Sequence, residues 1–324
     1  MRLLRRAIAL LAMTCPFVFG CGEFGLAAAP APTMTIEPTW TISPLPSPTV
    51  TETVTPTFVP TDTPTVSPSP TFTLTPTATV TPEPQFVFQG PGDVTVPILL
   101  YHHIGISQKD STYYISPDQF DRQMNLLYTW GYRTISVEQL VSAIRHGAEL
   151  PVKPILLTFD DGGETVYTDA FPILEKYGFT GTVYIVHYFV GVSLYMDRDQ
   201  IRELYNAGWE VGSHGLSHLD LTSRPGKQME EIVNSRSRLE SYLDVPVLSF
   251  AYPFGAYDKD SLYLVKYAGY VAAMGLGEEI IQGDRNIYYL YRQSITSDLN
   301  LETFASLLPW QSGLTTQLAV TVVP

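Results

Sequence analysis

Two short segments combine carboxylates with imidazoles at spacings that suit a hydrolytic metal site. The first contains the adjacent acids Asp160 and Asp161, and the second places His214 and His218 four residues apart. Zinc accepts imidazole and carboxylate ligands together and leaves a coordination position for water, while a neighbouring aspartate can act as a general base. Either motif alone is more often a turn, a helix cap or a surface polar group. Their joint occurrence favours a catalytic site.

Both motifs follow short apolar runs that we expect to be strands. Residues 154–159 have the length and composition of a buried strand, and residues 209–212 have a similar pattern. Because side chains alternate along a strand, Asp160 and Asp161 should point in different directions and take different roles. The spacing of His214 and His218 predicts that both lie on one face of a helical turn.

With a third segment, Ala251 to Gly255, these motifs make the sequence resemble the polysaccharide deacetylase family, the NodB-homology enzymes of carbohydrate esterase family 4. The resemblance covers most of residues 94–308. It implies that Asp160 is the catalytic base. Three residues would hold the metal, namely Asp161, His214 and His218. It also implies that Tyr252, Pro253 and Phe254 contact the substrate. The Phe254 backbone N–H would donate a hydrogen bond to the oxyanion.

The chain departs from the family pattern beside the catalytic base. Ala251 occupies the position where many members carry an arginine that steadies this aspartate. Arg292, in the strand-like residues 289–292, is a candidate replacement. The alternative is an ordinary surface or salt-bridged arginine.

The late histidine that usually supplies the catalytic acid is also missing, because no histidine follows His218. A strand-like run at residues 96–103 ends in His102 and His103. This run resembles the opening of the branch that acts on poly-N-acetylglucosamine, in which the order is circularly permuted and a histidine of the first strand is the acid. We therefore expect His102 to be the acid, with His103 as the alternative.

Strand-like and helical patterns alternate through residues 88–324, the predicted catalytic domain. Strands are expected near 94–101, 154–159, 180–187, 209–213, 247–252, 270–274 and 288–292. Helices are expected near 117–130, 136–146, 168–177, 197–207, 227–242, 258–268 and 301–308. Such alternation implies parallel strands joined by right-handed crossovers. We predict an α/β fold, an incomplete, distorted (β/α)7 barrel with its site at the carboxyl ends of the strands; an open doubly wound sheet is the alternative.

The N-terminal residues have the layout of an export signal followed by a spacer. Residues 1–21 contain Arg2, Arg5 and Arg6 before an apolar stretch, and Cys21 follows small-residue positions like those of bacterial lipoproteins. We expect a lipid anchor on Cys21, with plain secretion as the alternative. Residues 22–87 are rich in Thr and Pro and predict a disordered stalk. The catalytic domain would then be extracellular or held at the cell envelope.

Charge and motif content narrow the possible partners. The chain has a formal net charge of −13, which disfavours binding to nucleic acid, and it lacks a glycine-rich dinucleotide fingerprint. The expected substrate is an N-acetylated polysaccharide of peptidoglycan or poly-N-acetylglucosamine type. The expected activity is zinc-dependent hydrolysis of its carbon–nitrogen amide bond with release of acetate. A catalytically inactive carbohydrate-binding module and an O-acetyl xylan esterase are the alternatives.

Overall fold

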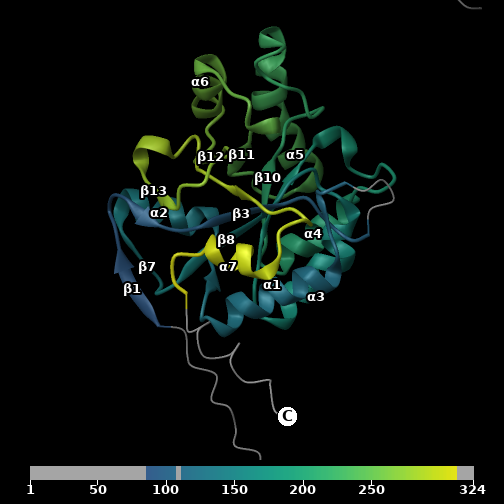
Figure 1. The fold of residues 1–324 in the computed structure, drawn as a ribbon. Helices are drawn as coiled ribbons and strands as arrows, with labels where there is room; N and C mark the ends of the chain where they lie inside the picture. Colours follow the sequence, from purple (N-terminus) through teal and green to yellow (C-terminus); the bar gives the residue numbers. More distant parts are fainter. Residues whose placement is uncertain (1–84, 107–110, 312–324) are drawn as a thin grey trace, which may run out of the picture. The chain divides into compact units, whose positions relative to one another are not determined.

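The computed structural model describes residues 85–106 and 111–311, and its centre is a parallel sheet (Figure 1). The strand order is β12-β11-β10-β9-β8-β3-β14, and β6 (Arg133–Thr134) also pairs with β8 off this path. The strands of the path are β3 (Ile98–Tyr101), β8 (Pro154–Phe159), β9 (Thr182–Ile185), β10 (Glu210–Ser213), β11 (Ser249–Ala251), β12 (Ala272–Met274) and β14 (Gln293–Ser294).

The two edges of the sheet are joined by an irregular stretch of chain. Residues 287–292 run beside β12, where Leu290 N–H donates to the Ala273 carbonyl at 2.8 Å and Leu290 forms an isolated parallel bridge with Met274. The same stretch leads directly into β14, which pairs with β3. The ring of strands is therefore distorted and incomplete as a sheet, which confirms the predicted (β/α)7 architecture.

The predicted strand at residues 288–292 is wrong. Two of its backbone donors are used by partners outside the main sheet: Tyr289 N–H donates to the Asn286 carbonyl at 2.7 Å, and Tyr291 N–H donates to the Gln282 side chain at 3.2 Å. A regular ladder cannot form with these donors occupied. The strand that joins the sheet begins one residue later, at Gln293.

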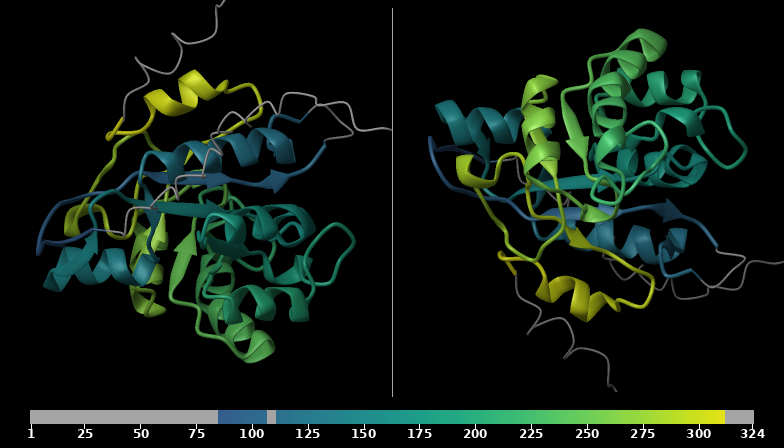
Figure 2. Two further views of the ribbon diagram at one scale, coloured as in Figure 1. Left: turned by 90° about the horizontal axis from the view of Figure 1, so that it is seen from below. Right: turned by 90° about the horizontal axis from the view of Figure 1, so that it is seen from above.

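The helices lie around the outside of the strands, as the turned views show (Figure 2). They are α1 (Pro117–Thr129), α2 (Val137–His146), α3 (Phe171–Lys176), α4 (Arg198–Asn206), α5 (Ser235–Leu243), α6 (Lys259–Tyr267) and α7 (Leu301–Ser306). Short π-helical turns lead into two of them, at Val166–Ala170 before α3 and at Met229–Asn234 before α5. Each helix lies where the sequence predicts one. Ser136 shows why the starts were predictable, since it forms a complete capping box with Gln139.

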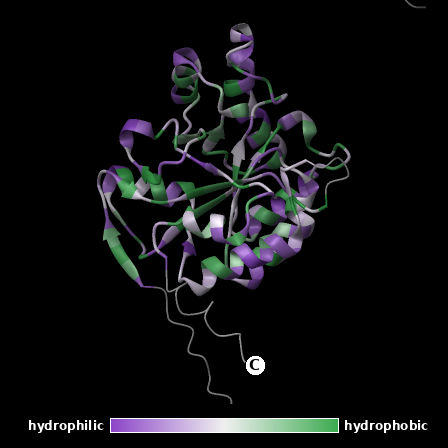
Figure 3. Cartoon of the chain, viewed as in Figure 1, coloured by the Kyte–Doolittle hydropathy of each residue, from purple (hydrophilic) through white to green (hydrophobic). Residues whose placement is uncertain are grey.

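The core is formed between the strands and the inner faces of the helices. Every residue of β8 is buried, as expected for a strand covered on both sides. Apolar residues accordingly concentrate on the central strands, whereas the helices carry both kinds of residue (Figure 3). Among the largest buried side chains, Phe159 packs against Trp209 with ring centroids 5.4 Å apart. This packing ties the last residue of β8 to the residue that precedes β10.

Three short strand pairs lie outside the main sheet. They are β1 (Phe86–Gln89) with β7 (Ala148–Pro151), β2 (Val94–Thr95) with β13 (Ile281–Gln282), and β4 (His103–Ile104) with β5 (Tyr114–Ile115). Residues 86 and 87, which we assigned to the stalk, belong to β1. The predicted signal, Cys21 and the stalk up to residue 84 lie outside the described residues. No helix in the described ranges is long and apolar enough to cross a membrane.

Candidate metal and catalytic site

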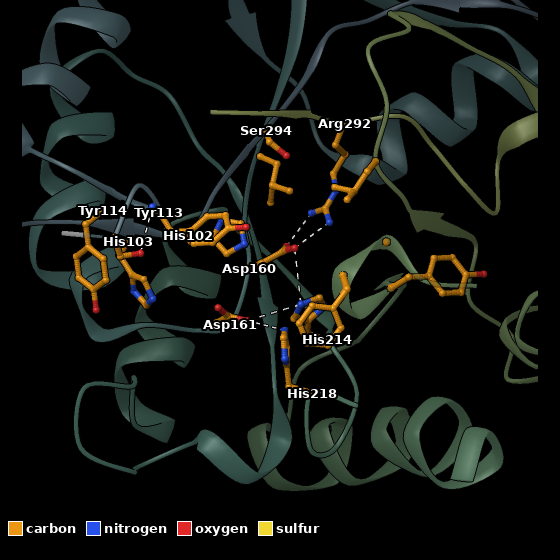
Figure 4. A pocket seen from close by; sticks show the side chains of 16 residues that line it. His102, His103, Tyr113, Tyr114, Asp160, Asp161, His214, His218, Arg292 and Ser294 are labelled. Carbon is orange, nitrogen blue, oxygen red and sulfur yellow. Dashed lines mark hydrogen bonds and ion pairs between the residues drawn. The ribbon is translucent and has the colours of Figure 1, made fainter. Parts of the chain in front are cut away.

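The three predicted metal ligands converge at the carboxyl ends of β8 and β10 (Figure 4). One ligand atom from each of Asp161, His214 and His218 lies within 4.8 Å of the other two. The Oδ1 atom of Asp161 is 3.2 Å from His218 Nε2 and 3.7 Å from His214 Nε2. This oxygen is buried and has no hydrogen-bond partner among the described residues. A buried, unpaired carboxylate oxygen facing two imidazole nitrogens fits a divalent cation.

The surroundings of His214 favour a role as a metal ligand. Its Nδ1 atom lies 2.8 Å from the Ala251 carbonyl oxygen, so the ring can donate there and leave Nε2 free to face Asp161. Burial lowers the pKa of His214 to about 4. The neutral ring that a metal requires is therefore the prevailing form at neutral pH.

Residues 214–218 form a loop, so the predicted helical turn is wrong. Gly215 and His218 have φ angles of 84° and 60°, which a right-handed helix does not allow. The buried carboxylate of Glu231 supports this loop by accepting three hydrogen bonds. Its donors are the Leu216 N–H at 2.8 Å, the Ser217 N–H at 3.0 Å and the Ser217 hydroxyl at 2.6 Å. Glu231 could not be predicted from the sequence, because no local pattern marks an acid on the following π-helical turn as a partner of this loop.

Asp160 is held beside the ligand set by Arg292. The two guanidinium nitrogens donate to the two carboxylate oxygens at 2.7 and 2.8 Å, and Arg292 is 1% exposed. The Nε atom of Arg292 also donates to the Gly275 carbonyl at 3.0 Å, which fixes the guanidinium plane. Burial, the largest single influence, would raise the pKa of Asp160, but the charge and hydrogen bonds of Arg292 together with the nearby His214 and His102 outweigh it, and the pKa falls to about 2. Asp160 is thus an oriented carboxylate at neutral pH, 3.7 Å from His214 Nε2.

Asp161 has the opposite electrostatic environment. Burial, followed by the neighbouring charge of Asp160, raises the pKa of Asp161 to about 7. A positive ion between Asp161 and the two histidines would offset both effects. The adjacent acids therefore occupy different environments, as their alternation along the chain predicts.

The two histidines at the end of β3 have different surroundings. The His102 ring lies toward Asp160 and contacts Tyr113 with centroids 4.6 Å apart, whereas His103 stacks on Tyr114 at 4.4 Å (Figure 4). A Cβ atom at position 163 would lie 2.5 Å from His103 Nδ1, so this ring is also packed against backbone. Burial lowers the pKa of both rings, that of His103 to about 4. This geometry favours His102 over His103 for a role beside Asp160.

These residues line a cavity of about 330 Å³. Of the three predicted substrate contacts, Tyr252 and Phe254 line this cavity and Pro253 does not. Tyr252 is fully buried in its wall, while Phe254 is 64% exposed and its ring lies 4.6 Å from that of His218. Phe254 has a φ of 61°, a backbone conformation rare outside glycine. Asp161 and His218 also have positive φ, so unusual backbone geometry concentrates at the site.

Comparison with known families agrees with this arrangement. Residues 147–273 match the family model described as polysaccharide deacetylase, a span that includes Asp160, Asp161, His214 and His218. Over these residues the chain is similar to the polysaccharide deacetylase family.

Similar proteins come from several bacteria. The poly-beta-1,6-N-acetyl-D-glucosamine N-deacetylase of Staphylococcus aureus is 27% identical over 208 residues, which is 59% of this chain and 71% of that protein. The Streptococcus pyogenes deacetylase PplD, solved in complex with acetate, is 28% identical with a TM-score of 0.61 and covers 66% of this chain and 98% of its own. IcaB from Ammonifex degensii is 25% identical with a TM-score of 0.56, covering 68% of this chain and 97% of its own.

The matched span leaves out two of the residues that complete the deacetylase site. His102 comes before residue 147 and Arg292 after residue 273, yet both line the same cavity as the matched residues. The barrel brings them together because β3 pairs with β8 and β14 pairs with β3. Residues from the two ends of the domain, His102 and Arg292, therefore lie in the same cavity as Asp160.

Proposed function

We propose that this protein is a metal-dependent N-deacetylase that hydrolyses the acetamide of N-acetylglucosamine units in a cell-surface polysaccharide and releases acetate. The observation that carries the proposal is the convergence of Asp161, His214 and His218 beside the Arg292-bound carboxylate of Asp160. The named activity of the S. aureus relative supports a poly-N-acetylglucosamine type of substrate. The export pattern and Cys21 support a location at the cell envelope.

Asp161, His214 and His218 would hold the cation, and their mixed nitrogen and oxygen atoms suit zinc. When bound there, the cation supplies Lewis acidity that activates water and a carbonyl oxygen. Asp161 can act as a ligand without giving up a hydrogen bond at the facing atom. This atom is the buried Oδ1 oxygen that lacks a partner among the described residues.

The proton transfers are assigned to Asp160 and His102. Asp160 accepts a proton from the attacking water, while Arg292 keeps both of its oxygens oriented. His102 donates a proton to the departing nitrogen, which leaves readily only as an amine. Because burial lowers the pKa of His102, its protonated form is a stronger acid than free imidazolium. The Phe254 backbone N–H is the assigned donor to the acetamide oxygen.

The substrate would lie between exposed aromatic side chains. Tyr113 and Phe254 both line the cavity, and both are exposed. Aromatic faces pack well against the apolar face of a sugar ring, while the hydroxyl of Tyr113 can bond to a sugar hydroxyl. The acetamide would then enter the cavity toward Asp160.

Acetate release by the purified protein tests this proposal. The protein is stripped with a chelator, supplied with zinc, and incubated with poly-N-acetylglucosamine oligomers, peptidoglycan fragments or acetylated xylan. We expect zinc-dependent acetate release from an N-acetylated polymer. Binding of the oligomers with no acetate release would instead indicate an inactive carbohydrate-binding module. Acetate from acetylated xylan alone would indicate an O-acetyl esterase.

A further inference from the structure

We propose that a tyrosine-lined groove next to the catalytic pocket binds a second stretch of the same glycan chain, an inference that rests on the proposed function. The groove is lined by Tyr257, by residues of α6 and by the stretch 284–291, and it has a volume of about 720 Å³. This volume is within the range of about 300–1,000 Å³ that ligand pockets occupy. Five of its lining residues are tyrosines: Tyr257, Tyr263, Tyr288, Tyr289 and Tyr291.

The lining of the groove suits an uncharged sugar chain. Tyr257 and Tyr263 are 43% and 65% exposed, so both can offer aromatic surface to the carbon–hydrogen face of a pyranose. Lys259 and Arg285 also line the groove and can donate hydrogen bonds to hydroxyl and acetamide oxygens. Apolar faces combined with a few polar groups are the usual composition of a small-molecule site.

Residues that line the two cavities contact each other, which indicates that the groove binds the same glycan chain as the catalytic pocket. Tyr252, in the wall of the catalytic pocket, packs against Tyr257 and Tyr289 of the groove with centroids 5.8 and 5.9 Å apart. The Tyr289 hydroxyl donates to the carbonyl of Gly255, which also lines the catalytic pocket, at 3.0 Å. The cavities therefore lie on the two sides of one shared wall. A polymer with one sugar in the catalytic pocket extends beyond it, and the groove is the adjoining site where its neighbouring sugars can bind.

The shared wall is already assembled in this structure. The rings of Tyr257 and Tyr289 lie 4.1 Å apart, and Lys266 sits 4.9 Å above the ring of Tyr288. Rings held in this way lose little freedom when a ligand binds, which favours affinity. The groove should therefore contribute to binding of long chains and not to the chemical step.

Helix α6 offers a matched pair of variants, Tyr263→Ala and Tyr267→Ala. The two side chains are one helical turn apart, and they are 65% and 64% exposed, but only Tyr263 lines the groove. Their rings contact each other at 6.2 Å, so both variants lose that contact equally. Any difference between them reports the groove and not the loss of an exposed tyrosine.

Steady-state kinetics of the full-length zinc-loaded protein on N-acetylglucosamine oligomers of increasing length tests the proposal. We expect Tyr263→Ala to raise KM by about two- to tenfold for long oligomers, the value of one aromatic stacking contact. KM for the disaccharide, kcat for all lengths, and both constants of Tyr267→Ala should stay unchanged. The proposal would be overturned if the two variants had the same KM for long oligomers. It would also be overturned if Tyr263→Ala raised KM for the disaccharide as much as for long oligomers.

A binding measurement separates this inference from the proposed activity. Calorimetry with the chelated protein measures oligomer affinity when no turnover occurs. If the wild type releases no acetate from any oligomer, the proposed activity fails. The groove is still supported if Tyr263→Ala alone weakens binding of long oligomers, and it is refuted if both variants bind as the wild type does.

Discussion

Replacing Arg292 with methionine should destabilise the metal-free protein, because it leaves the buried carboxylate of Asp160 without its counter-charge. In the folded protein the pKa of Asp160 is about 2, against an ordinary value of 3.8. This difference corresponds to roughly 2 kcal/mol of stability at neutral pH. Without Arg292, the penalty that burial places on the charged form of Asp160 loses its main offset. We therefore expect a total loss of about 3–5 kcal/mol, as for other broken buried ion pairs.

The pH dependence has a definite sign. The pKa of Asp160 in the folded wild type is lower than in the unfolded chain. The ionised carboxylate therefore stabilises the fold above pH 3.8, and this stabilisation is lost as the pH falls toward about 2. In Arg292→Met the pKa of Asp160 should rise above 3.8 instead. The deficit of the variant should then shrink as the pH is lowered from 7 to 5, because Asp160 can take up a proton.

Urea unfolding in the presence of a chelator, at pH 7 and pH 5, measures these differences. Arg122→Met is the control, since Arg122 forms an exposed pair with Asp118 and should cost less than about 1 kcal/mol. Adding Asp160→Asn to Arg292→Met removes the unpaired charge and should recover most of the loss. A loss below about 1 kcal/mol in Arg292→Met, or no recovery in the double variant, would refute the reasoning.

Three further substitutions address the remaining parts of the site. His102→Gln should lower acetate release by about 10²–10⁴-fold while zinc content stays at the wild-type level, whereas His214→Gln should lose both; equal zinc loss in the two would contradict the assigned roles. Glu231→Gln should weaken zinc affinity by about 10–100-fold in a competition titration with a chelating dye, and the partly exposed neighbour Glu230→Gln serves as control. No difference between them would remove Glu231 from the support of the loop. Gly215→Ala should lower the free energy of unfolding by at least about 1 kcal/mol, since the residue has a φ of 84° and the new Cβ would lie 2.8 Å from Glu231 Oε2; an unchanged urea midpoint would count against this.

Most elements of the fold were predictable because their signals are local. Residues 154–159 form β8 as expected, since a continuous apolar run suits a strand buried on both faces. Ser136 begins α2 through a capping box that spans only four residues of sequence. The errors occurred where side chains replaced regular backbone pairing, as in residues 288–292, where the Gln282 side chain accepts from Tyr291 N–H.

The sequence by itself determined which residue types stand at the ends of which strands, so Asp160, Asp161, His214 and His218 could be assigned to one site. Only the tertiary structure decided what surrounds them. Arg292 lies 132 residues from Asp160 and reaches it through the chain that joins the two edges of the barrel. Glu231 and the difference between His102 and His103 likewise depend on which distant segments meet. Strand formation depends on neighbouring residues, whereas the pairing of buried charges depends on the closure of the whole barrel, and no local pattern in the chain encodes it.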